Sequence, residues 1–365
     1  MSVIISVVVI CLMLGILITV HEFGHFIAAR LCGIEVTQFA IGMGPVLYRR
    51  QKKDANGEPS GTLFTIRALP IGGFCNMAED EDSDDPAHFR NKNIWQKLFV
   101  LSAGSLMNVL AGMLMFFIFF LFLIGKELPA PVITELTDDC PYAGQIMPGD
   151  RFYSINGNRI YNDNDLEIFL TRDTDKPYTF VLQRGNERVT VPGVERKVEI
   201  KNENGEVISY RFGFSYGTTD RVTLSYALRH TWYYSVNNVR LIWMSLGDLI
   251  SGAAEPTEMM GPVGIGGVVN QVVQEESISA PEKALGILTL AGVVAVNLAV
   301  MNLLPIPALD GGRILFLFIS AILILIRKKP LSAKIEGYIH GVTMLLLFSL
   351  MFFIFFNDIM RLINF

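Results

Sequence analysis

The feature that most constrains this chain is the pattern His21-Glu22-Phe23-Gly24-His25, which directly follows an apolar run at residues 3–20. Residues four apart share one face of a helix, so both imidazoles can reach one metal ion, with Glu22 placed to handle a proton. Ionisable side chains at bilayer depth are costly and usually functional. The pattern therefore predicts zinc-dependent hydrolysis inside a membrane. The alternative is a helix end whose polar side chains only meet the lipid headgroups.

Composition also indicates a membrane protein. The 365 residues are 51% hydrophobic and only 18% charged, which is too apolar for an ordinary soluble protein. Four stretches are long enough to cross a bilayer of about 30 Å as helices. They are residues 3–31, 98–124, 284–326 (long and interrupted) and 339–356. The first has no basic n-region and contains the metal motif, so we do not expect it to be a cleaved signal peptide.

The distribution of Lys and Arg predicts the orientation. The loops between the first and second spans and between the third and fourth spans are basic, whereas the termini are almost free of Lys and Arg. The positive-inside rule then places both loops in the cytoplasm and both termini outside. His21 and His25 fall towards the cytoplasmic end of their helix. The basic residues are Arg49, Arg50, Lys52, Lys53, Arg67, Arg90, Lys92 and Lys97 in the first loop, and Arg327, Lys328, Lys329 and Lys334 in the second.

Two regions between the spans have strand composition. Residues 34–41, 46–48 and 62–67, with Asn56-Gly57 in a turn, predict a small membrane-associated sheet. Such a sheet could offer an edge to an extended peptide or simply pack between helices. Outside the membrane, residues 131–134, 151–155, 178–184 and 187–191 predict strands, residues 163–171 a helix, and residues 198–201 and 207–212 a further hairpin. Residues 222–250 favour an interfacial amphipathic helix, on which we expect His230 to be a surface residue.

A catalytic zinc site usually has three protein ligands, and Asp310 is the candidate for the third. It follows Pro305 and Pro307 inside the interrupted third span. Broken helix is tolerated at membrane depth only where it is buried or lines a wet cavity. A capping Asp at the start of a new helix is the alternative. Asn297 and Asn302 in the same span could bind an extended substrate backbone or hold the broken helix together.

With these residues together, the chain resembles the site-2 protease family of zinc intramembrane proteases. It is most similar to the bacterial type, which trims membrane-anchored anti-sigma factors and signal-peptide remnants. The resemblance covers nearly the whole chain and rests on five segments in the order of the family. They are His21-Glu22-x-x-His25, Pro70-Ile-Gly-Gly73, Ala103-Gly104-x-x-x-Asn108, Asn297, and Asn302-x-x-Pro305-x-Pro307-x-x-Asp310-Gly311.

The outer domain resembles a PDZ domain through Tyr142-Ala-Gly-Gln-Ile-Met-Pro-Gly-Asp150 and Ser154-Ile-Asn-Gly157, with a peptide-carboxylate loop expected near Phe212-Gly213-Phe214. The chain departs from the family at Ser105, where Pro is common, and in having one such domain where some relatives have two. The presence of a single domain affects what can be expected of substrate gating more than what can be expected of the reaction.

The resemblance implies a polytopic α-helical membrane protein of about four transmembrane helices, with a membrane-associated β-sheet and an inserted extracytoplasmic α/β PDZ domain. The expected divisions are 1–125 (first two spans, zinc motif and cytoplasmic loop), 126–215 (PDZ domain), 216–283 (interfacial helix and juxtamembrane segment) and 284–365 (last two spans with the third ligand). It also implies localisation in the bacterial inner membrane.

The implied activity is zinc-dependent endoproteolysis. Zn²⁺ would be held by His21, His25 and Asp310, Glu22 would be the catalytic base, and Asn297 and Asn302 would bind substrate. Expected partners are the lipid bilayer and single-span membrane proteins already cut by another protease, with no nucleic acid. A catalytically silent scaffold and a metal transporter are the alternatives. The first would be favoured by loss of Glu22 or Asp310, and the second by several polar spans lining a path.

Overall fold

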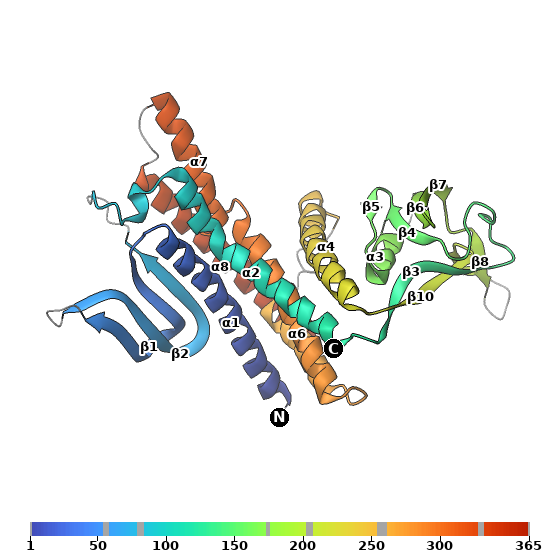
Figure 1. Cartoon of the computed structure of the whole chain (residues 1–365), viewed down its shortest axis with the longest axis horizontal. Helices are drawn as coiled ribbons and strands as arrows, with labels where there is room; N and C mark the ends of the chain where they lie inside the picture. The colour runs from blue at the N-terminus through green and yellow to red at the C-terminus, as the bar shows by residue number, and fades with distance from the viewer. Residues whose placement is uncertain are drawn as a thin grey trace. The chain divides into compact units, whose positions relative to one another are not determined.

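The computed structural model describes residues 2–53, 58–78, 84–172, 176–201, 207–253, 261–327 and 332–363. The chain forms two compact units. The first combines Met1–Phe116 with Asn238–Phe365, and the second is Phe117–Asn237. Figure 1 shows the elements of each unit along the chain. The unit boundaries cut through two long helices, so each unit contains part of a helix that continues into the other.

Within the described residues, four helices are long and apolar enough to cross a membrane, in agreement with the number expected. These spans are Ile5–Leu31, Ile94–Phe122, Ala280–Leu303 and Lys334–Asp358. They belong to helices α1 (Ser2–Leu31), α2 (Ile94–Phe122), α6 (Ala280–Leu303) and α8 (Ala333–Ile363).

Small residues let the helices of the first unit approach closely. A Cβ atom on Gly24 of α1 would lie 2.4 Å from the carbonyl oxygen of Ala103 on α2. A Cβ atom on Gly112 of α2 would lie 2.9 Å from the carbonyl oxygen of Gly292 on α6. Contacts this close exclude any side chain, and they are typical of helices that associate in lipid, where small residues line the interface.

The third predicted span is interrupted, as expected. Helix α6 ends at Leu303 and helix α7 (Asp310–Arg327) starts six residues after Leu304. The loop between them contains Pro305 and Pro307, and Ala308 adopts a left-handed conformation with φ of 83°. The Ala308 N–H donates a 2.7 Å hydrogen bond to Nδ1 of His340 on α8. The loop that precedes Asp310 is thus fixed by a bond to another helix.

A long antiparallel hairpin lies along α1 (Figure 1). Its strands are β1 (Val36–Lys53) and β2 (Pro59–Met77), which include all three predicted strand segments. The predicted Asn56-Gly57 turn lies outside the described residues. The hairpin meets the helix closely, because a Cβ atom on Gly15 would lie only 2.0 Å from the carbonyl oxygen of Pro70.

The second unit is built on a sheet with strand order β10-β3-β4-β6-β7, and β5 (Asn158–Arg159) pairs with β4. The remaining strands of this path are β3 (Glu127–Leu136), β4 (Arg151–Ile155), β6 (Tyr178–Arg184), β7 (Glu187–Val194) and β10 (Phe214–Arg221). The predicted strands and the helix α3 (Asp163–Thr171) are present. Strands β8 (Val198–Lys201) and β9 (Val207–Arg211) form the predicted separate hairpin.

Strand β10 was not predicted. It pairs with β3, so a domain boundary at residue 215 falls inside the sheet. The sequence of β10 is polar and contains Gly217, which hides its strand character. The core beneath the sheet holds contacting rings of Phe152, Phe180 and Phe214.

Helix α4 (Leu224–Ser251) matches the predicted amphipathic helix, and a further helix α5 (Pro262–Gln274) was not predicted. The expectation that His230 lies at the surface was wrong. Its side chain is buried, with 5% of the residue exposed, and its ring stacks on Tyr226 with centroids 3.6 Å apart. The charged neighbour Arg229 and the polar residues Asn237 and Asn238 further along the helix gave no sign of this burial.

Candidate metal centre

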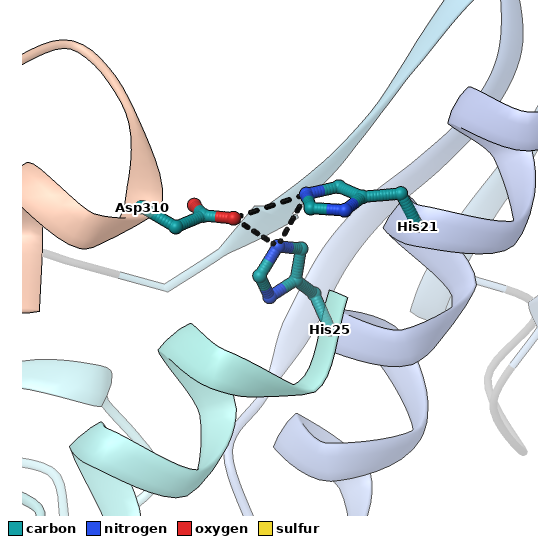
Figure 2. A group of neighbouring side chains, drawn as sticks. All are labelled: His21, His25 and Asp310. Atoms are coloured by element: carbon teal, nitrogen blue, oxygen red, sulfur yellow. Dashed lines mark hydrogen bonds and ion pairs between the residues drawn. The ribbon is translucent and has the colours of Figure 1, made fainter. Parts of the chain in front are cut away.

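Two histidines of α1 and one aspartate at the start of α7 point towards one another (Figure 2). Asp310 Oδ2 lies 3.0 Å from His21 Nε2 and 3.1 Å from His25 Nε2. The two imidazole Nε2 atoms are 3.2 Å apart. Although 285 residues separate His25 from Asp310 in the chain, the fold brings the three groups together.

The donor set fits a zinc ion. His nitrogens and carboxylate oxygens about 2.1 Å from a tetrahedral zinc ion are about 3.4 Å from one another. The three observed separations, 3.0 to 3.2 Å, form a triangle close to that size. Without a shared cation, two imidazole nitrogens and a carboxylate oxygen would have too few protons for three good hydrogen bonds. His21, His25 and Asp310 are therefore the residues that could hold a metal.

The ring of His25 is oriented by the backbone of α2. Its Nδ1 lies 2.8 Å from the carbonyl oxygen of Val100. A carbonyl can only accept, so Nδ1 carries the proton and Nε2 presents its lone pair to the centre of the triangle. The terminal amide of Asn302 on α6 lies 3.5 Å from both ring nitrogens of His21. Each imidazole is thus contacted by a second helix.

Glycines shape the space around the ligands. A Cβ atom on Gly104 of α2 would lie 2.5 Å from His25 Nε2 and 2.7 Å from His21 Nε2. Any larger residue there would collide with the ligand nitrogens. On the opposite side, a Cβ atom on Gly311 would lie 2.2 Å from the carbonyl oxygen of Leu304, so the turn into α7 can be tight.

A cavity of about 230 Å³ opens beside the ligands. Its lining includes Glu22, Asn108 and Asn302 in addition to His21 and Asp310. Asn108 is 1% exposed, and neither its amide nitrogen nor its amide oxygen has a hydrogen-bond partner among the described residues. A buried amide without partners is costly. It therefore marks a position where a polar group is expected to bind.

The structure brings five of the six predicted site residues together: His21, Glu22, His25, Asn302 and Asp310. Asn297 lies five residues before Asn302 on α6 and does not line this cavity. The sequence interpretation assigned no role to Gly104 and Asn108, although both were in a quoted motif. Their spacing of four residues places them on one face of α2, and this was the signal that could have identified them.

Comparisons with known proteins agree with this geometry. The model of peptidase family M50 matches residues 9–350. A Clostridium perfringens protein named provisionally as a zinc metalloprotease is 33% identical over 350 residues, covering 94% of this chain and 95% of the relative.

Two Bacillus relatives are also similar along almost their full length. The zinc metalloprotease RasP of Bacillus licheniformis is 27% identical over 448 residues, covering 98% of this chain and 99% of the relative. The regulator of sigma-W protease RasP of Bacillus subtilis is 27% identical over 440 residues with the same coverage. With four membrane-length helices and a two-His, one-Asp centre, the chain belongs to peptidase family M50, the site-2 proteases, and is a zinc metalloprotease of the inner membrane.

Proposed function

We propose that the protein is an intramembrane endopeptidase that cuts transmembrane segments of single-span membrane proteins. The observation that carries this proposal is the triangle of His21, His25 and Asp310 ligand atoms. It is formed by the membrane-length helix α1 and by the start of α7, which follows the membrane-length helix α6. In this proposal these three residues hold Zn²⁺. A zinc ion held there supplies a Lewis acid that polarises a carbonyl and acidifies a water molecule.

Glu22 is the proposed general base. Its side chain lines the same cavity as His21 and Asp310, where it can take a proton from the attacking water and give it to the leaving amine nitrogen. The unpartnered amide of Asn108 faces the oxygen of the scissile carbonyl in this arrangement. A preorganised donor at that position favours the charge that develops on the oxygen.

A substrate helix must unwind before its backbone can be cut, because its amides are bonded to one another. The proposed contacts for the unwound strand are Asn302 and, five residues earlier on α6, Asn297. The β1–β2 hairpin is a second candidate, since its edge could pair with an extended peptide. Helix-breaking residues in the substrate should therefore promote cleavage.

The proposed topology follows the positive-inside rule. Both basic loops are cytoplasmic, and both termini and the second unit are extracytoplasmic. In this orientation the metal centre lies near the cytoplasmic end of α1. The name of the Bacillus subtilis relative suggests substrates that control a sigma factor, and we propose that such substrates arrive after a first cut by another protease.

We further propose that the second unit is a PDZ-like domain that limits access by size or reads a new C-terminus. The structure offers a clean deletion to test this. The Gly125 N–H donates to the carbonyl oxygen of Val222, and the Val222 N–H donates to the carbonyl oxygen of Lys126, both at 2.9 Å. Residues 127–221 can therefore be replaced by a short linker. Cleavage of substrates with bulky outer domains should then appear, and continued exclusion would reject the filter.

The catalytic proposal is tested with the purified full-length protein and a single-span substrate lacking its outer domain. Cleavage within the span should be abolished by a zinc chelator and by Glu22→Gln. The Glu22→Gln variant should keep its zinc, because Glu22 is not a ligand. Turnover by Glu22→Gln would remove Glu22 from the role of base, and cuts only outside the span would reject intramembrane proteolysis.

A further inference from the structure

A second cavity lies within the second unit, and it is strongly cationic. Its volume is about 580 Å³, within the range of about 300–1,000 Å³ that is usual for ligand sites. The lining combines residues of the sheet strands, including β4, β5, β7 and β10, with the first turns of α4. It includes five arginines and one carboxylate, although the whole chain has a net charge of −5. The arginines are Arg151, Arg159, Arg188, Arg221 and Arg229, and the carboxylate is Asp220.

The single carboxylate is already neutralised. Arg151 Nη2 lies 2.8 and 2.7 Å from the two carboxylate oxygens of Asp220. Among the residues that the structure describes, Arg188, Arg221 and Arg229 have no carboxylate within ion-pair distance. Their charges therefore add to a positive potential in the cavity, and a bound anion would neutralise this potential.

Two of the guanidinium groups are held in place by one ring. The Cζ atoms of Arg159 and Arg188 lie 3.3 and 3.7 Å from the centroid of the Tyr153 ring. Stacking on an aromatic face restricts both long side chains. Arg159 also donates from Nη1 to the carbonyl oxygen of Tyr153 at 3.4 Å. A guanidinium carries five N–H donors in one plane. Planar donors arranged in this way suit the oxygens of a phosphate group.

His230 adds a hydrogen-bonding group that nothing in the described protein uses. It lines the cavity, it is 5% exposed, and its Nδ1 has no hydrogen-bond partner among the described residues. Burial, together with the charge of Arg229, lowers the pKa of His230 to about 4. The ring is therefore neutral near pH 7, and one of its nitrogens can donate to a ligand oxygen.

The cavity also adjoins the end of a membrane span. Phe120, two residues before α2 ends, packs against Tyr226 and His230 of the cavity wall with ring centroids 6.0 Å apart in each case. On α4, Leu224, Leu228 and Trp232 are 55%, 58% and 58% exposed and repeat every four residues. An exposed apolar stripe that includes Trp is typical of a helix at the membrane surface.

From these observations we propose that the arginine-lined cavity binds the phosphate of an anionic phospholipid headgroup. The stripe lies on the side of α4 that faces away from the cavity, so it indicates that this helix lies at the membrane surface but does not line the lipid site. The guanidinium groups would bind the phosphate, and the acyl chains would enter the bilayer beside the end of α2. This site is separate from the metal centre, and the proposal does not depend on the proteolytic role. A soluble phosphate or an acidic peptide would not need a site next to the end of a membrane span.

The test uses the full-length protein released from nanodiscs that contain equal amounts of phosphatidylglycerol and phosphatidylcholine. Native mass spectrometry counts the lipids retained on each chain. We expect phosphatidylglycerol to be retained preferentially in the wild type. The double variant Arg188→Gln, Arg229→Gln should lose this retention by about tenfold or more, because charge-assisted bonds to phosphate are removed. Both arginines are exposed, so the variant should fold, and its zinc content checks this.

Two further variants and two competitors make the result decisive. Arg211→Gln removes an exposed arginine of the same unit that does not line the cavity, and it should retain lipid as the wild type does. The double variant Arg188→Lys, Arg229→Lys keeps the charge, and its lipid retention should lie between that of the wild type and that of the double Gln variant. Equal retention of both lipids, or unchanged retention in the double Gln variant, would overturn the proposal. Displacement of the lipid by millimolar inorganic phosphate or by an acidic peptide would also overturn it, in favour of a soluble ligand.

Discussion

The metal centre and the arginine-lined cavity both gather charged side chains, but they come from the chain in different ways. Two of the three candidate ligands occupy one helical turn of α1, so their meeting is fixed by local geometry. The cavity takes its arginines from β4, β5, β7, β10 and α4. The first site can be recognised from a short motif, whereas the second exists only once the sheet is assembled.

The sites also differ in how closely the backbone surrounds them. Gly104 and Gly311 leave no room for a side chain beside the ligands. In the cavity two of the five arginines stack on an aromatic ring, and three of the five are exposed. We therefore expect single substitutions beside the histidines to abolish zinc binding. Single substitutions in the cavity should only weaken lipid binding.

The largest effect is expected at Gly104. The Gly104→Ala variant places a Cβ atom 2.5 Å from His25 Nε2, so zinc should fall from about one ion per chain to nearly none. The matched control is Gly341→Ala on α8, where a Cβ atom meets nothing within 4 Å. Metal analysis of both purified variants checks this. A Gly104→Ala protein with full zinc would contradict the close packing described here.

The next largest effect distinguishes zinc binding from catalysis. Asn108→Ala should keep zinc but lower the cleavage rate by about 100-fold, as loss of one preorganised donor does elsewhere. Asn297→Ala should have a smaller effect, because Asn297 does not line the cavity beside the ligands. Cleavage rates and zinc contents of the two variants are the measurement. A larger loss in Asn297→Ala would place the reacting carbonyl elsewhere.

A third prediction concerns the loop between α6 and α7, which positions Asp310. His340→Phe removes the acceptor of the Ala308 N–H and should weaken zinc binding by about tenfold, because groups behind a ligand orient it. Glu336→Gln is the control, since its carboxylate is 3.7 Å from the other nitrogen of His340 and does not touch the loop. Competition with a chelator measures both affinities. Equal affinity in His340→Phe would show that the loop needs no such bond.

The smallest effect concerns the cavity residue His230 and the pH dependence of the free energy of unfolding. The pKa of His230 is about 4 in the folded protein, against 6.5 for an ordinary histidine. Between these values the unfolded chain binds more protons, so stability falls as the pH falls. The loss is about 2 kcal/mol between about pH 7 and about pH 5. Calorimetry should show a flatter pH dependence for His230→Phe. The same slope in both proteins would mean that the ring is not buried as described.

The sequence predicted the spans, the members of the His21, His25 and Asp310 cluster and most strands, because each depends on a local pattern. Hydropathy defines a span, a four-residue spacing defines a helix face, and Pro305 and Pro307 indicate the break before Asp310. The proximity of Asp310 to the histidines could be inferred only from the need for a third ligand and from the family resemblance.

What could not be predicted depends on non-local packing. Strand β10 is polar and owes its conformation to pairing with β3. His230 is buried by Tyr226 and Phe120, and the space for a side chain at Gly104 is closed by an adjacent helix. None of these has a periodic signal along the chain, because β3, Phe120 and helix α1 are distant in sequence from β10, His230 and Gly104, respectively.

The most direct test asks whether Asp310 is the third zinc ligand beside His21 and His25. X-ray absorption at the zinc edge of the full-length protein should show only nitrogen and oxygen ligands. The Asp310→Cys variant should then show one sulfur neighbour at about 2.3 Å. Zinc bound to Asp310→Cys without a sulfur neighbour would contradict the account, because the ion would be held by residues other than these three.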